Sequence, residues 1–136
     1  AVAQQLALAD NTPLRRMALM ATSPLLPAPG LGVGTLFDAD VLTSGVRLTG
    51  TSLIGIGAQL LAANGWSVGS ALPRLTDVPT LILGARSDMV VPIAYAQWLA
   101  RLIPGARLEI VDGAHLFAFR QSEKIGGMIA AFLDAD

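Results

Sequence analysis

The sequence predicts an α/β fold with a parallel sheet, and three features indicate this class. Short apolar runs of strand length alternate with segments whose apolar residues recur at helical spacing. Two of these runs, 79–85 and 106–111, each end in a turn marked by glycine. The connections are those of strand–helix–strand units, which are right-handed crossovers between parallel strands.

A helix is expected first, from Ala1 to Asp10, where Ala and Leu dominate. Val2 and Leu6 fall at helical spacing within it. No Ser, Thr, Asp or Asn precedes it as an N-cap, so we expect a helix that continues from an upstream segment. After Asn11-Thr12-Pro13, the apolar run in residues 14–23 predicts a strand buried on both faces.

Residues 24–72 interrupt this alternation. The part up to Gly34 is punctuated by Pro and Gly and is expected to be loop, and residues 52–64 could form a weak helix that ends at Asn64-Gly65. About fifty residues exceed what a simple connection needs. We therefore expect an inserted cap or lid over 24–72, with 1–23 and 73–136 forming part of an α/β core.

The second half of the chain is more regular. It predicts a strand over 79–85, a helix over 92–103 with Pro92 at its first position, a strand over 106–111 and a helix over 117–133. The expected inward-facing residues of the two helices are Ile93, Ala96, Leu99, Ala100 and Ile103, and Ile125, Met128, Ile129, Phe132 and Leu133.

The composition is unusually apolar for a chain of 136 residues. Hydrophobic residues make up 53% and charged residues 14%, against about a quarter charged in typical domains. A membrane protein would explain this, but polar residues and glycines interrupt the most apolar stretch, 48–66, so we expect no transmembrane segment. We favour a domain whose remaining part covers these apolar faces.

Several functions are excluded or disfavoured. The net charge is −1 and there is no basic run, so no nucleic-acid partner is expected. The absence of cysteine excludes disulfides, thiolate metal sites and a cysteine nucleophile, and a single histidine argues against a metal site. No cofactor is expected.

The chemistry is expected at Asp88 and His115, each just past a predicted strand. Chemistry collects at the carboxyl ends of parallel strands, and a carboxylate one strand away can orient a histidine base. The pair therefore suggests two parts of a nucleophile–base–orienter relay. Taken singly, Asp88 could be a turn former or helix cap, and His115 an ordinary loop residue.

Other candidates are weaker. Asp112 is expected to end its strand and cap the turn at Gly113. Ser87 lacks the glycine-flanked turn that exposes a nucleophile, and the glycines of 30–34 miss the spacing of phosphate loops. Trp66 and Trp98 are expected to be packing anchors.

The Asp-turn and His-turn pattern resembles the C-terminal half of the α/β-hydrolase family, in which the triad occurs in the order Ser, Asp, His. Within that family the chain is most similar to intracellular poly(3-hydroxyalkanoate) depolymerases. The residues that carry this similarity are Ala3-Gln4-Gln5, the segment 55–66 and Ala114-His115-Leu116-Phe117. The chain departs from many relatives at Arg86-Ser87, where they carry acidic residues.

The resemblance implies a cytoplasmic serine-type hydrolase of carboxylic esters, with Asp88 and His115 in its triad. The nucleophilic serine and the oxyanion hole would lie before Ala1, in a missing N-terminal half of the fold. An apolar ester or polyester is the implied substrate, with Gln59, Leu60 and Trp66 as candidate contacts in the cap.

Two alternatives remain open. The chain could belong to another α/β-hydrolase, such as a carboxylesterase, a lactonase or a cofactor-free haloperoxidase. It could also be a fragment that binds a partner and has no activity alone, and in isolation we expect it to be aggregation-prone.

Overall fold

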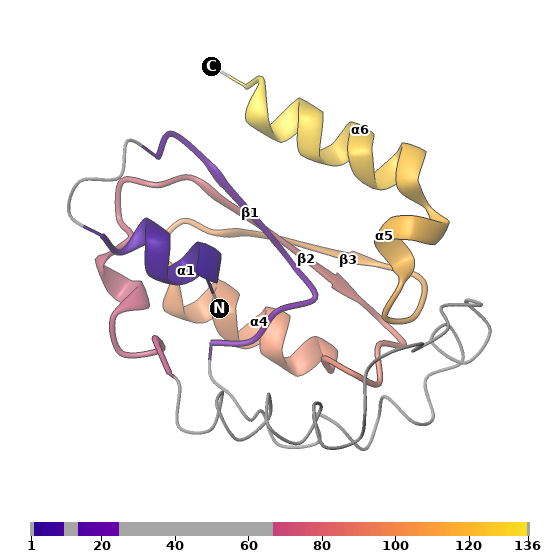
Figure 1. The fold of residues 1–136 in the computed structure, drawn as a ribbon, viewed down its shortest axis with the longest axis horizontal. Helices are drawn as coiled ribbons and strands as arrows, with labels where there is room; N and C mark the ends of the chain where they lie inside the picture. Colours follow the sequence, from indigo (N-terminus) through magenta and orange to yellow (C-terminus); the bar gives the residue numbers. More distant parts are fainter. Residues whose placement is uncertain (1, 10–13, 25–66, 136) are drawn as a thin grey trace, which may run out of the picture.

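The computed structural model describes residues 2–9, 14–24 and 67–135 (Figure 1). The elements in these ranges are α1 (Val2–Ala7), β1 (Met17–Met20), the short 3-10 helix η2 (Leu72–Arg74), β2 (Thr80–Ala85), α4 (Ile93–Leu102), β3 (Arg107–Val111), α5 (Phe117–Arg120) and α6 (Ser122–Leu133). The predicted strands are therefore confirmed.

The sheet has the order β1-β2-β3, and both pairs of neighbouring strands are parallel. Met17 pairs with Thr80 at the start of β1, and Ala85 pairs with Val111 at the end of β3. All six residues of the central strand β2 are buried. This strand is nearly all apolar, as expected of a strand covered on both faces.

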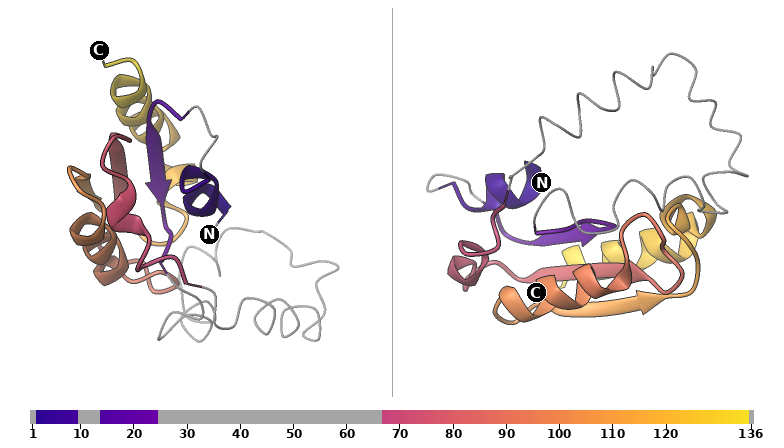
Figure 2. Two further views of the ribbon diagram at one scale, coloured as in Figure 1. Left: turned by 90° about the vertical axis from the view of Figure 1, so that its left-hand side faces the viewer. Right: turned by 90° about the horizontal axis from the view of Figure 1, so that it is seen from below.

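Helices cover both faces of the sheet, as Figure 2 shows from two sides. Because side chains alternate along a strand, Ile82 joins the core under α4, whereas Leu81 and Leu83 join the core under α5 and α6. The first core contains Met17, Leu19, Val68, Leu72, Leu75, Ile82, Ala96, Leu99 and Ile103. The second contains Leu81, Leu83, Ala85, Val111, Phe117 and Ile125.

The helix expected over 117–133 is two helices. α5 ends at Arg120 and α6 begins at Ser122, because Gln121 has φ −121° and ψ 37°, outside the helical region. The inward-facing residues of α6 are as expected except for Leu133, which is 48% exposed at the end of the helix.

The helix α4 begins one residue later than expected. Pro92 is its N-cap and not its first helical residue, with an extended ψ of 142°. Ala96, Leu99 and Ile103 are buried as predicted, and Tyr95 is buried with them. Trp98, expected as a packing anchor, is 37% exposed and contacts the ring of Tyr95.

The orientation of α1 differs from what its apolar residues suggested. Leu6 is 55% exposed, whereas Gln4 is fully buried. Within the part of the chain that the structure describes, neither polar side-chain atom of Gln4 has a hydrogen-bond partner. The predicted cap, 24–72, lies mostly outside the described residues; of it, Pro24 and residues 67–72 are seen, and Leu72 opens η2.

Candidate active site

Asp88 and His115 lie in the two turns that follow neighbouring parallel strands. β2 ends at Ala85 and β3 at Val111, so both turns leave the sheet at the same edge, on the right in Figure 1. Their side chains meet there. The Nδ1 atom of His115 is 3.1 Å from Oδ2 and 3.2 Å from Oδ1 of Asp88.

The carboxylate of Asp88 is almost completely buried, with 1% of its side chain exposed. Its Oδ1 atom accepts hydrogen bonds from the backbone N–H groups of Val90 (2.9 Å) and Val91 (2.8 Å). A buried carboxylate is stable only when donors surround it, and these two amides and the imidazole provide them. Asp88 therefore both forms the turn before α4 and orients His115.

The contact selects one tautomer of His115. An ionised carboxylate only accepts hydrogen bonds, so Nδ1 must carry the proton that it donates to Asp88. In the neutral imidazole, the lone pair is then on Nε2. The imidazole is a quarter exposed. This is the arrangement of a histidine base whose orientation a carboxylate fixes.

Backbone hydrogen bonds join the two turns beyond the ends of the strands. The N–H of Arg86 donates to the carbonyl of Val111 (2.9 Å), and the N–H of Ser87 donates to the carbonyl of Gly113 (3.0 Å). The side chains of Arg86 and Asp112 also pair, with Nε 3.2 Å from Oδ1. The two backbone hydrogen bonds hold the turn of Asp88 beside the turn of His115, and the exposed ion pair adds little.

Gly113 has a conformation that favours glycine. Its φ is +132°, and a Cβ at this position would lie 3.0 Å from Nε2 of Gln121 and 3.2 Å from Cβ of Phe117. The turn between β3 and His115 is therefore tightly packed as well as unusual in its backbone.

The other residues singled out from the sequence have different outcomes. Ser87 is exposed and contributes its backbone N–H to the turn, and Asp112 pairs with Arg86. Gln59, Leu60 and Trp66, the candidate substrate contacts, lie outside the described residues.

Although the nucleophile is expected before Ala1, one serine within the chain also lies in a nucleophile motif. The pentapeptide Gly65-Trp66-Ser67-Val68-Gly69 matches the pattern G-x-S-x-G. In hydrolases this pattern forms a sharp turn between a strand and a helix. Ser67 instead precedes a turn that leads to η2, and its Oγ accepts a hydrogen bond from the N–H of Gly69 (3.4 Å).

Ser67 is also at the wrong end of the sheet. A Cβ at Gly69 would lie 3.8 Å from Cδ1 of Leu102, the last residue of α4. α4 starts near the turn of Asp88, and its ten residues extend about 15 Å away from it. Figure 1 shows residues 67–74 on the left and the turn of His115 on the right. The structure does not bring Ser67 to His115.

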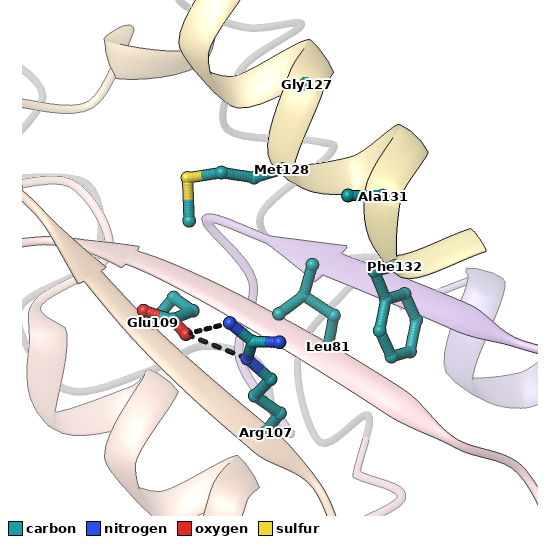
Figure 3. A pocket seen from close by; sticks show the side chains of 7 residues that line it. All are labelled: Leu81, Arg107, Glu109, Gly127, Met128, Ala131 and Phe132. Carbon is teal, nitrogen blue, oxygen red and sulfur yellow. Dashed lines mark hydrogen bonds and ion pairs between the residues drawn. The ribbon is translucent and has the colours of Figure 1, made fainter. Parts of the chain in front are cut away.

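A cavity of about 340 Å³ lies between the sheet and α6 (Figure 3). Leu81 and Arg107, near the starts of β2 and β3, line it with Glu109 and with Gly127, Met128, Ala131 and Phe132 of α6. It is therefore at the opposite end of the strands from Asp88 and His115 and does not form part of their site.

Two negative findings apply to ranges 2–9, 14–24 and 67–135. No group of three or more His, Cys, Asp or Glu side chains there could hold a metal ion. None of the helices in these ranges is long and apolar enough to cross a membrane.

Comparison with known proteins supports the fold. No family model matches the chain. An α/β hydrolase from a Medee basin deep-sea metagenome library superposes with a TM-score of 0.74 at 14% identity, over 99% of this chain and 62% of that one. The chain has the fold of the C-terminal part of an α/β hydrolase. A hydrolase from Pseudomonas aeruginosa PA01 shares this hydrolase fold, with a TM-score of 0.77 and 22% identity over 98% of this chain and 61% of that one.

The sequence itself is similar to that of a curated enzyme. It is 35% identical to the poly(3-hydroxyalkanoate) depolymerase of Ectopseudomonas oleovorans over 78 residues, which are 57% of this chain and 27% of that enzyme. The chain thus spans about a quarter of the curated relative. The resemblance to depolymerases expected from the sequence is confirmed.

Proposed function

We propose that this chain supplies the base and the orienting carboxylate of a serine-type carboxylic ester hydrolase. The observation that carries the proposal is the contact of His115 Nδ1 with the buried carboxylate of Asp88, at the carboxyl ends of neighbouring strands. In a hydrolase fold, this contact between Asp88 and His115 has the geometry that base catalysis requires.

The proposed reaction has two steps. In the first, a serine hydroxyl attacks the ester carbonyl while Nε2 of His115 takes its proton, and the imidazolium then protonates the leaving alcohol. In the second, water attacks the acyl-enzyme with His115 again as base, which releases the acid and restores the serine. Asp88 stabilises the imidazolium in both steps and remains ionised.

We place the nucleophile before Ala1, in a longer protein that also supplies the oxyanion hole. The order Ser, Asp, His of this fold supports that placement, as does the fact that the chain spans only about 60% of the solved hydrolases. The partner of this chain in the proposal is therefore the N-terminal half of the same fold.

The proposed substrates are apolar esters, including oligomers of 3-hydroxyalkanoates. The identity to a depolymerase supports this class. We assign residues 24–72 to a cap over the acyl chain, with Gln59, Leu60 and Trp66 as contacts, since pockets for small molecules are largely apolar. A cytoplasmic location belongs to the same proposal.

Hydrolysis of p-nitrophenyl octanoate tests the proposal. Four proteins are compared: this chain, the chain extended by its natural upstream segment, and the extended form carrying His115→Ala or Ser67→Ala. We expect turnover by the extended form and by its Ser67→Ala variant, and none by the other two. An inert extended form would refute the hydrolase function, and loss of activity in the Ser67→Ala variant as well as in His115→Ala would identify Ser67 as the nucleophile.

A panel of acyl chains separates depolymerase-like activity from the activity of another α/β-hydrolase, such as a carboxylesterase, lactonase or cofactor-free haloperoxidase. A depolymerase should prefer 3-hydroxyacyl oligomers over simple esters of equal length. If the chain is instead a non-catalytic fragment that binds a partner, none of these substrates will be turned over by any form.

A further inference from the structure

Gln121 lies between α5 and α6 and is hydrogen-bonded on three sides. Its backbone N–H donates to the carbonyl of Phe117 (2.9 Å), and its carbonyl accepts from the N–H of Ile125 (2.9 Å). Its side-chain amide leaves the helices and donates to the carbonyl of Asp112. Gln121 thus joins the last two helices to the turn that carries His115.

The side-chain amide also packs directly on that turn. A Cβ at Gly113 would lie 3.0 Å from Nε2 of Gln121, so the absence of a side chain at Gly113 makes room for the amide. On its other side, Gly113 accepts the hydrogen bond of Ser87 through its carbonyl. Residues 112–113 are therefore held on one side by Ser87, in the turn after β2, and on the other side by Gln121.

The interruption between α5 and α6 coincides with the contact between Gln121 and Asp112. Gln121 has a φ of −121° and a ψ of 37° at the break between α5 and α6. A continuous helix over 117–133, as its sequence pattern predicts, would keep residue 121 in the helical region. The departure from that conformation accompanies the contact with Asp112.

We propose that Gln121 is a positioning residue for His115: by holding the Asp112–Gly113 turn, it keeps the imidazole against Asp88. This inference rests on the proposed function for its meaning in catalysis. The contacts themselves do not depend on that function, so the test below measures the imidazole directly and not turnover.

The single histidine of the chain makes the test specific. In a long-range ¹H–¹⁵N NMR spectrum, the imidazole signals come from His115 alone and report which nitrogen carries the proton. We would record this spectrum, at a pH where the imidazole is neutral, for the wild-type chain and for Gln121→Met and Gln121→Lys. Met is close to Gln in size and has no donor, whereas Lys is flexible and retains one.

In the wild type we expect the Nδ1–H tautomer. In Gln121→Met we expect at least about a twofold rise in the Nε2–H population, because the carboxylate no longer fixes the tautomer fully. Gln121→Lys retains a donor and should therefore give the same tautomer population as the wild type. Gln97→Met in α4 is the matched control and should leave the spectrum unchanged, and urea unfolding of all variants shows whether the fold is kept.

A wild-type tautomer population in a folded Gln121→Met variant would overturn the proposal. So would equal effects of Gln121→Met and Gln121→Lys, which would indicate loss of packing and not of the hydrogen bond. Failure of the ester hydrolase function would be seen only in the turnover assay, whereas an Nε2–H tautomer in the wild type would contradict the Asp88–His115 pair itself.

Discussion

Gly84 of β2 and Ala96 of α4 are in such close contact that a Cβ added at Gly84 would lie 2.8 Å from the Cβ of Ala96. Both atoms would be fixed to their backbones, so no side-chain rotation could relieve the overlap. We predict that Gly84→Ala destabilises the chain by about 1–3 kcal/mol, the usual cost of overpacking a core. Urea unfolding followed by circular dichroism measures this change.

Gly126 is the matched control for Gly84. It lies in α6, is exposed, and a Cβ added there would have nothing within 4 Å. Alanine is the better helix former, so Gly126→Ala should stabilise the chain by about 0.5–1 kcal/mol. Equal effects of the two substitutions would contradict the close packing of β2 on α4.

Asp88→Asn should change the tautomer of His115 more than the stability of the chain. The amide oxygen of Asn can still accept the hydrogen bonds of Val90 and Val91, so we expect a loss of only about 1–2 kcal/mol. Its NH₂ group would face Nδ1 as a donor, which forces the proton to Nε2. The same NMR measurement checks this, and an unchanged Nδ1–H tautomer would refute the orienting role of Asp88.

In an active, extended form of the protein, the same substitution should lower kcat by about 10⁴, the loss found when the triad carboxylate becomes an amide and the tautomer is wrong. Asp112→Asn is the control, because the side chain of Asp112 is 92% exposed and its pairing with Arg86 contributes little. We expect it to retain both the tautomer and the activity.

Gly113→Ala and Gly105→Ala separate backbone strain from crowding. Both glycines have positive φ, +132° and +69°, but a Cβ at Gly105 would meet nothing within 4 Å. We expect Gly105→Ala to cost about 1 kcal/mol for its conformation alone, and Gly113→Ala to cost about 2–3 kcal/mol because Gln121 and Phe117 are also displaced. Urea unfolding of the two variants gives the difference, and a larger cost at Gly105 would contradict the packing at Gly113.

Tyr95 should make the stability of the chain sensitive to alkaline pH. Burial raises the pKa of Tyr95 above its ordinary value of 10.0. The folded state therefore holds the phenolic proton more tightly than the unfolded state, so this contribution is complete below pH 10 and is lost as the pH rises through the folded pKa. Phenolate absorbance reports Tyr95 alone, since it is the only tyrosine. In Tyr95→Phe, this part of the alkaline loss of stability should disappear.

The regular part of the fold could be predicted because local pattern and tertiary burial agree there. β2 is a nearly continuous apolar run and is buried at every position, and polar residues flank it, Thr76-Asp77 before it and Arg86-Ser87-Asp88 after it. The site could be predicted for the same reason: once the strands are parallel and adjacent, residues just past their ends must be neighbours.

The differences arise where a tertiary contact decides the local structure. The helix predicted over 117–133 runs through Gln121, yet the contact of its side chain with Asp112 coincides with a break in the helix. In α1, helical periodicity could not show that Gln4 is buried and Leu6 exposed, since the six residues present too few apolar positions to define a face.

At Ser67, a local sequence pattern suggests a function that the tertiary structure does not support. A five-residue pattern specifies only composition, whereas a nucleophile also needs a strand before it and a helix after it. Ser67 matches the pattern, but the element that follows it is the short 3-10 helix η2, and the segment before it lies outside the described residues. A search for the pattern alone would therefore place the nucleophile at the end of the sheet away from His115.

The hydrogen bonds that join the two turns of the site have a consequence for how the sequence can diverge. The bonds from Arg86 to Val111 and from Ser87 to Gly113 run between backbone atoms, so any residue with an N–H group can provide the donors. Positions 86 and 87 are thereby released from selection for their side chains, and the charge beside Asp88 can change during evolution without moving it.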